Sequence, residues 1–128
     1  MPAWEEYKAQ AKSRGALAHE LYAVLSTPAS SPEDVKANLQ SHLAYQAEQE
    51  AKGTLFLAGP VSDEAGALME GMGLIIYAAP SLEEARALAE ADPMHKSGAR
   101  TFVLRRWMIN EGSLNLSLKL SAQSARFA

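Results

Sequence analysis

Short blocks of apolar and polar residues follow one another along the chain and predict strands and helices in a regular order. Compact apolar runs at residues 20–26, 54–58, 73–79 and 101–109 predict strands, because β-branched, aromatic and leucine side chains favour a buried, pleated backbone. Helical spacing of apolar residues predicts helices over residues 2–14, from residue 31 to about 52, and over residues 81–92. The order between residues 19 and 109 is therefore β, α, β, β, α, β.

The longer helix carries clear start and stop signals. Ser31 is a favourable N-cap, Pro32 occupies the first helical position, and Gly53 is expected to end the helix. Its predicted apolar stripe consists of Val35, Leu39, Leu43 and Ala47. We therefore expect His42 to lie beside the buried face of this helix.

Beyond the fourth strand, leucine occupies every second position. The stretch SLNLSLKLS, residues 113–121, alternates four leucines with polar residues, which is typical of a strand with one buried and one wet face. Residues 110–112 are expected to form the turn of a hairpin with the strand at 101–109.

Two split βαβ halves predict an α+β fold, a ferredoxin-like sandwich (βαββαβ) with both helices on one face of an antiparallel sheet. We expect residues 1–128 to form a single domain, with an N-terminal helical extension (1–18), a core (19–109) and a C-terminal strand extension (110–128). The strands LFLA and LIIY are apolar on both sides, so the second sheet face also needs cover. A homodimer or higher homo-oligomer in which two sheets pack face to face would provide it.

Composition narrows the class of partner. The net charge of −3 disfavours nucleic acid as a partner, since nucleic-acid binding needs a clustered basic surface. The local cluster of Arg100, Arg105 and Arg106 is interpreted as a solvated sheet face or a paired interface charge, with phosphate or carboxylate capture as the alternative. The chain has no cysteine and no run of 18 apolar residues, so we expect a cytoplasmic protein with no membrane partner.

Common cofactor and catalytic motifs are absent from the sequence. It contains no GxSxG, HExxH or GxxxxGK[ST] motif, and the two glycines of GMGLII precede a strand instead of following one. The histidines, His19, His42 and His95, have no metal-ligand spacing. We therefore expect no cofactor and no metal.

One pair of residues is a candidate for proton-transfer chemistry. His42 lies on the inner flank of a helix, and Asp63 follows the strand that ends at Gly59-Pro60, in the loop AGPVSDEAG. A carboxylate next to an imidazole fixes its tautomer and raises its basicity, which gives a general base that works near neutral pH. The structural alternatives are a hydrogen-bonded core histidine and a turn-forming aspartate.

The order of several short motifs resembles the YciI-like (YCII-related) family. The similarity covers about residues 19–109 and rests on His42-Leu43, AGPVSD, GLII, SLEEARALAEADP and the strand with Trp107. It implies a ferredoxin-like protomer in a dimeric α/β barrel, and a pocket lined by a His and an Asp that correspond here to His42 and Asp63. At least one branch of the family acts as a dehydrochlorinase. The chain departs from the family pattern in its two extensions, in Met94 after Asp-Pro, and in the lack of a basic residue shortly before His42.

These observations predict a small cofactor-independent enzyme in which His42, oriented by Asp63, transfers a proton on a small organic substrate, of the aromatic or lactone type. Isomerisation and elimination suit such a base. Tyr22 and Trp107 are candidates for pocket walls, with core packing as their alternative role. The rival function is a non-catalytic ligand-binding or assembly module of the same fold, and a third is cofactor-free oxidation by oxygen.

Overall fold

The computed structural model describes residues 1–127, which divide into two compact units. The first unit is Glu20–Trp107, and the second joins Met1–His19 to the residues from 108 onward. These boundaries fall within two residues of the expected core, 19–109. That the core and its extensions act as one domain stays a prediction.

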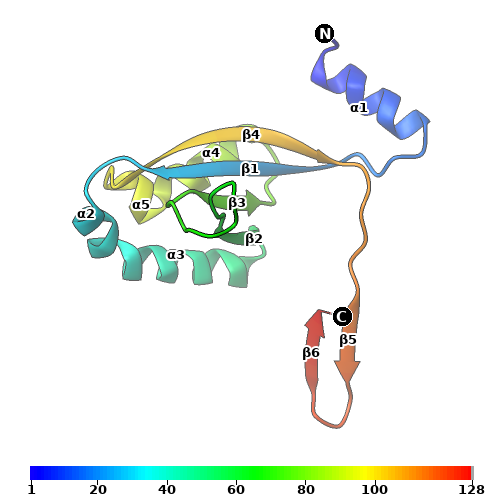
Figure 1. Ribbon diagram of the computed structural model, residues 1–128. Helices are drawn as coiled ribbons and strands as arrows, with labels where there is room; N and C mark the ends of the chain where they lie inside the picture. The colour runs from blue at the N-terminus through cyan, green and yellow to red at the C-terminus, as the bar shows by residue number, and fades with distance from the viewer. Residues whose placement is uncertain (128) are drawn as a thin grey trace. The chain divides into compact units, whose positions relative to one another are not determined.

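The elements follow the expected order, with short additions (Figure 1). In chain order they are α1 (Trp4–Ser13), β1 (His19–Pro28), α2 (Pro32–Ala37), α3 (Leu39–Lys52), β2 (Leu55–Pro60), β3 (Gly73–Tyr77), α4 (Leu82–Ala91), α5 (Pro93–Lys96), β4 (Arg100–Ile109), β5 (Leu116–Lys119) and β6 (Ser124–Phe127). None of the helices among residues 1–127 has the length and apolar character needed to cross a bilayer.

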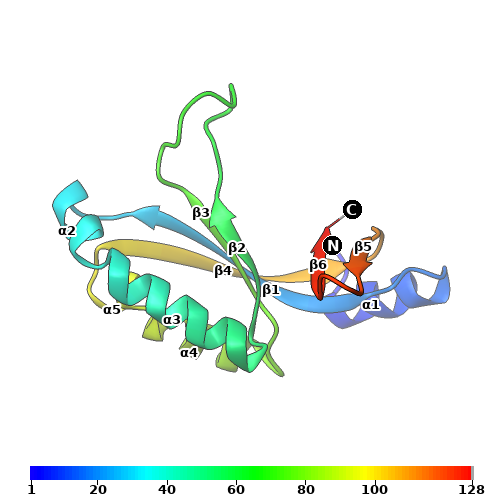
Figure 2. The ribbon, with the colours of Figure 1, turned by 90° about the horizontal axis from the view of Figure 1, so that it is seen from below.

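Four strands of the first unit form one sheet in the order β2-β3-β1-β4. Strand β3 is antiparallel to both β1 and β2, and β4 runs opposite to β1 (Figure 1). Helices α3 and α4 lie on the same side of this sheet (Figures 1 and 2). The ferredoxin-like α+β prediction is confirmed.

The core lies between the sheet and helix α4. Register places Tyr22 opposite Tyr77 and Val24 opposite Ile75, so their side chains share the face toward the helices. They pack with Ala85, Ala89 and Leu104 in one buried cluster. Because alanines form the inner face of α4, the helix backbone can approach the sheet closely.

The predicted helix from residue 31 to 52 is wrong in one respect, since it is broken at Asn38. Ser31 does cap the first part, accepting a hydrogen bond from the Asp34 amide, and Gly53 ends the second part in the left-handed conformation. At Asn38 the backbone leaves helical geometry (φ −100°, ψ 0°), and its side-chain amide donates to the Asp34 carbonyl at 2.8 Å. An asparagine side chain competes in this way with the backbone hydrogen bonds of the helix, which explains the break.

The predicted orientation of α3 is also wrong. Leu39 and Leu43 are 44% and 53% exposed, whereas Tyr45 and Gln49 face inward together with His42. The inner face is polar because it meets polar groups: Tyr45 donates to the Leu88 carbonyl at 2.7 Å. An apolar stripe indicates the buried side only where the opposing surface is apolar as well.

The C-terminal leucine strand does not pair with β4 as predicted. Instead, β5 and β6 form a separate two-stranded antiparallel sheet, with Leu116 opposite Phe127 and Leu118 opposite Ala125. The leucines are not half-buried, since Leu116 and Leu118 are 60% and 65% exposed. The extension therefore contains two strands where one was expected, and their apolar face is uncovered among residues 1–127.

Candidate functional site

His42 forms a close contact with Asp92. The Nδ1 atom of His42 lies 2.8 Å from each carboxylate oxygen of Asp92. The Asp92 side chain is fully buried, and the His42 side chain retains 16% exposure. The contact joins the first turns of α3 to the junction of α4 and α5, which are distant in sequence but adjacent in space.

Local structure explains how Asp92 reaches this position. Pro93 cannot continue the hydrogen-bonding of α4, and Asp92 adopts an extended backbone (φ −61°, ψ 126°) that ends this helix. The same residue is the N-cap of α5, where its Oδ1 accepts from the Met94 amide at 2.9 Å. A buried carboxylate is tolerated only when its oxygens are hydrogen-bonded, and here Met94 and His42 supply the donors.

This geometry assigns the tautomer of His42. A carboxylate accepts hydrogen bonds, so the proton of the neutral ring lies on Nδ1, facing Asp92. The Nε2 atom then carries the free lone pair. An imidazole held in this way has one nitrogen fixed by a carboxylate and the other able to accept a proton from a bound molecule.

Asp63 lies elsewhere, in the loop between β2 and β3. Its Oδ1 accepts from the amides of Ala67 and Leu68 at 2.8 and 3.0 Å, and these hydrogen bonds lower the pKa of its carboxyl group. No hydrogen bond or ion pair joins Asp63 to His42 within residues 1–127. The structure thus brings His42 together with Asp92, whereas Asp63 uses its carboxylate to order its own loop. A catalytic role for Asp63 stays a prediction.

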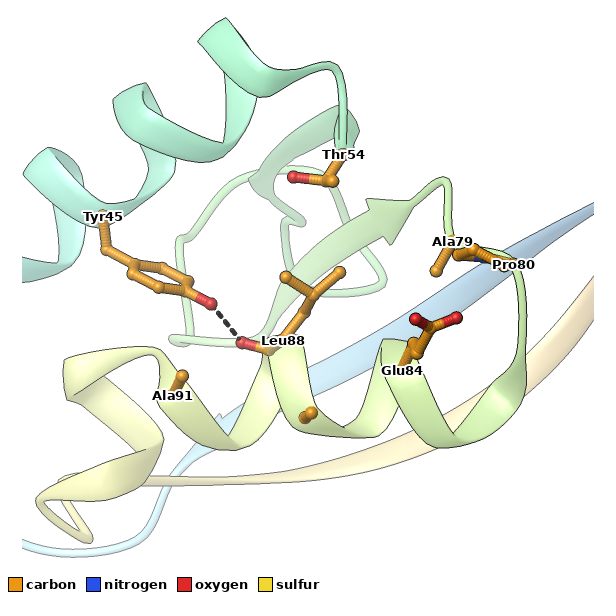
Figure 3. Close-up of a pocket in the computed structure, with 8 residues that line it drawn as sticks. Tyr45, Thr54, Ala79, Pro80, Glu84, Leu88 and Ala91 are labelled. Carbon is orange, nitrogen blue, oxygen red and sulfur yellow. Dashed lines mark hydrogen bonds between the residues drawn. The ribbon is translucent and has the colours of Figure 1, made fainter.

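An apolar pocket of about 350 Å³ is lined from α3 and α4 (Figure 3), and neither His42 nor Asp92 is among its lining residues. Tyr45 lines it from α3, three residues after His42, and Ala91 lines it from α4, next to Asp92. The remaining lining residues are Thr54, Ala79, Pro80, Glu84, Ala87 and Leu88. Its volume lies within the usual range for small-molecule sites, about 300–1,000 Å³. Neither Tyr22 nor Trp107 lines it: Tyr22 is in the core, and Trp107 is 43% exposed.

Two tyrosines are held neutral near Asp92. Burial, followed by the negative charge of Asp92, raises the pKa of both Tyr45 and Tyr77. The Tyr45 hydroxyl donates to Leu88, as Figure 3 shows. The Tyr77 hydroxyl is buried and has no hydrogen-bond partner within residues 1–127.

The unpartnered hydroxyl leads to a prediction. Tyr77→Phe is expected to leave the free energy of unfolding unchanged or to raise it by up to about 1 kcal/mol, because it removes a buried polar atom that makes no hydrogen bond. Urea unfolding of the two proteins measures the difference. A loss of more than about 1 kcal/mol would show that the hydroxyl has a partner in solution.

A second polar network ties the far end of β1 to α5 and β4. His95 Nδ1 donates to the Ala89 carbonyl at 2.7 Å, so its Nε2 accepts from the Ser26 hydroxyl at 2.8 Å. Arg100 Nε in turn donates to Ser26 Oγ at 2.8 Å, and Arg100 also binds the carbonyls of Ser26 and Gly71. Ser26 is 2% exposed, so this network is structural and offers no accessible nucleophile.

This network predicts acid sensitivity. Burial, which outweighs the opposing effects of the Ala89 carbonyl and Asp92, lowers the pKa of His95 from its usual 6.5. The unfolded chain therefore binds this proton more readily, and the stability contributed by neutral His95 is complete above about pH 6.5 and is lost as the pH falls through the folded-state pKa. Unfolding free energies between pH 5 and 8 should fall less steeply on acidification in His95→Gln than in the wild type. Equal steepness would contradict the assignment.

Asp92 is the functional candidate that sequence reasoning missed. Its position before Pro93 was sufficient to predict a helix end, but not the direction of its carboxylate. The signal that could have identified it was the Asp-Pro element of the family pattern. Among residues 1–127 no group of three or more His, Cys, Asp or Glu side chains is arranged to hold a metal ion.

Comparisons with known proteins agree with this fold. The family model described as the YCII-related domain matches residues 20–108. One similar solved structure is 5-chloro-2-hydroxyhydroquinone dehydrochlorinase (TftG) from Burkholderia phenoliruptrix AC1100, in complex with 2,5-dihydroxybenzoquinone, with 21% identity and a TM-score of 0.52 over 68% of this chain and 92% of that chain. At this identity the likeness establishes the fold alone. No curated protein sequence matches the chain.

Proposed function

Since this chain belongs to the YCII-related domain family, we propose that it is a small cofactor-independent enzyme in which His42 transfers a proton on a small organic substrate. The observation that carries the proposal is the contact of His42 Nδ1 with the fully buried Asp92 at 2.8 Å. A carboxylate in this position orients the ring and stabilises the imidazolium that forms when Nε2 takes a proton.

The pocket lined from α3 and α4 supports a substrate with an apolar body. Its lining is mainly alanine, leucine and proline, and its polar groups are those of Tyr45, Thr54 and Glu84. Such a surface suits a flat ring with few substituents better than a highly charged molecule. We propose an aromatic or lactone-like substrate and a reaction that removes a proton, such as isomerisation or the elimination of a leaving group.

Chloride release tests this proposal directly. TftG acts on 5-chloro-2-hydroxyhydroquinone, so that compound is offered to the wild-type chain without added metal or nucleotide. Loss of HCl requires a base that takes the proton while chloride leaves with the bonding electrons. Catalysed chloride release would therefore support the proposal. Saturable binding of 2,5-dihydroxybenzoquinone without turnover would favour the rival, a ligand-binding module. If neither chloride release nor binding of 2,5-dihydroxybenzoquinone is observed, the proposed substrate class is overturned.

We also propose that the protein is a homodimer. Leu57, Val103 and Trp107, on strands β2 and β4, are 53%, 46% and 43% exposed. Val103 and Trp107 alternate with the core residues Phe102 and Leu104, so they belong to the sheet face that points away from the helices. Apolar side chains left exposed on a sheet face favour burial against a second copy.

A further inference from the structure

The polar side chains that line the pocket of Figure 3 offer a ligand hydrogen-bond acceptors and no donor within residues 1–127. Tyr45 donates its hydroxyl proton to the Leu88 carbonyl at 2.7 Å, so its oxygen presents lone pairs to the pocket. The Thr54 hydroxyl lies 2.8 Å from the side-chain oxygen of Gln49 and 3.1 Å from its carbonyl, so its single proton is donated to Gln49. The carboxylate of Glu84 accepts only. A ligand must therefore bring its own donors.

Glu84 is placed at the rim of the pocket by the first turn of α4. It lies one helical turn before Leu88 and projects from the same side of the helix, as Figure 3 shows. One of its carboxylate oxygens, Oε2, accepts a long hydrogen bond of 3.3 Å from the Ser81 hydroxyl. The Glu84 side chain makes no ion pair within residues 1–127. Its other oxygen, Oε1, is thus available to a bound molecule.

Positive charge is missing from the pocket wall. No lysine, arginine or histidine of residues 1–127 is among the lining residues. Arg86 follows Glu84 by two positions on α4, so it lies about 200° away around the helix axis, and it is exposed. Near the end of α3, Lys52 is already paired with Glu48 at 2.8 Å. A ligand carboxylate would find no cationic side chain on this wall.

Two further carboxylates make the surroundings of the pocket negative. The charges of Asp92 and Glu48 add to the effect of burial, which is the larger cause, and raise the pKa of Tyr45. Both carboxylates therefore act on a hydroxyl that lines the pocket. The N-terminal end of α4 would by itself favour an anion, but Glu83 and Glu84 already supply negative charge in its first turn. The electrostatic balance thus favours a cation.

The rest of the pocket limits the size and the charge of that cation. The apolar lining consists of Ala79, Pro80, Ala87, Leu88 and Ala91, around a volume of about 350 Å³. This volume is near the lower end of the range for small-molecule sites, which suits a body of about one ring. A second charge on the ligand would lie against apolar side chains without a partner. A single ammonium group matches the wall in both respects, because it is positive and donates hydrogen bonds.

We infer that this pocket binds a small primary amine in its ammonium form, with an apolar body of about one ring, and that Glu84 selects the amine. A neutral alcohol matches the acceptors but not the charge, and a carboxylate matches neither. The inference rests on the proposed function only for the further step that such an amine is also a substrate. Binding of the amine does not depend on His42.

Three probes with the same ring test this inference in the full chain. Phenethylamine, phenethyl alcohol and hydrocinnamate differ in their polar end, which is an ammonium, a hydroxyl and a carboxylate at pH 7. Changes in the amide chemical shifts of Thr54, Ala79 and Leu88 give the dissociation constants and locate the bound probe. Phenethylamine is expected to bind at least about threefold more tightly than phenethyl alcohol, and hydrocinnamate most weakly. Added salt should weaken binding of the amine and leave that of the alcohol unchanged.

A matched pair of variants tests the role of Glu84. Glu84→Gln removes the charge and keeps the size, and glutamine is also favourable at this capping position, so α4 is expected to be retained. The variant should bind phenethylamine about threefold or more weakly, and phenethyl alcohol within about twofold of the wild type. Glu83→Gln makes the same change of charge in the same helical turn. Because Glu83 does not line the pocket, both dissociation constants should stay within about twofold.

Several results would overturn the inference. These are hydrocinnamate binding as tightly as phenethylamine, an unchanged preference for the amine in Glu84→Gln, and phenethylamine that shifts no amide signal of the pocket. The outcome is separate from that of the proposed reaction. Selective binding of the amine by a chain that releases no chloride would support the inference and count against the reaction, whereas chloride release without a preference for the amine would do the reverse.

Discussion

His42→Asn is expected to lower the proposed proton-transfer rate by about 10²–10⁴-fold, the usual contribution of a positioned general base. Asparagine places an amide nitrogen close to the position of Nδ1, so it can still donate to Asp92, but it has no group at the position of Nε2. The variant therefore separates the base from the contact that holds it. The rate is measured as chloride release under the conditions given above.

Two controls accompany this experiment. His19→Asn changes an exposed histidine at the start of β1 and should leave the rate unchanged. Asp63→Asn tests the carboxylate named by the family resemblance, and because Asp63 binds amides of its own loop, the rate is expected to stay within a fewfold of the wild type. A loss in Asp63→Asn as large as that in His42→Asn would restore Asp63 as the catalytic partner. A fully active His42→Asn would remove His42 from the mechanism.

Asp92→Ala is expected to lower the free energy of unfolding by about 2–4 kcal/mol. The substitution removes the N-cap of α5, worth about 0.5–2 kcal/mol, and the charge-assisted hydrogen bond to His42, worth about 1.5–3 kcal/mol. Part of this loss is offset because the variant no longer buries a carboxylate. Since small domains are stable by only about 5–15 kcal/mol, this is a large fraction. Urea unfolding measures it, with Glu90→Ala on the exposed face of α4 as the control.

A conservative change at the same residue tests the assigned tautomer. In Asp92→Asn the amide group offers both a donor and an acceptor to His42, so the preference for the proton on Nδ1 should weaken. Nitrogen chemical shifts of the imidazole report the proportion of each tautomer. A wild-type ring already protonated mainly on Nε2 would contradict the assigned tautomer. An Asp92→Ala variant destabilised by less than about 1 kcal/mol would contradict the stabilising role given to Asp92.

Sequence pattern was sufficient for most of the core. Apolar runs predicted the four strands, of which β1, β3 and β4 contribute buried side chains to the core, and the caps at Ser31 and Gly53 depend on local chemistry that is visible in a few residues. The order of elements then left the ferredoxin-like sandwich as the natural arrangement.

The errors arose where structure depends on distant or competing groups. Leu39 and Leu43 formed the expected stripe, yet α3 turns His42, Tyr45 and Gln49 inward because Asp92, Leu88 and Thr54 offer hydrogen bonds there. The alternating leucines predicted a strand correctly, but period-two patterning does not specify the pairing partner, and β6 took the place expected for β4. Which carboxylate contacts His42 depends on tertiary structure, which the spacing of residues along the sequence does not encode.

The position of Asp92 at a junction shared by two helices has an evolutionary consequence. Polar groups at active sites commonly reduce stability, so that selection for a stable fold tends to remove them. Here the carboxylate that orients His42 also begins α5, and selection for folding alone would retain it. A lineage that lost the proposed reaction could therefore keep Asp92 unchanged long after His42 had diverged, which makes position 42 the better indicator of the proposed chemistry among relatives.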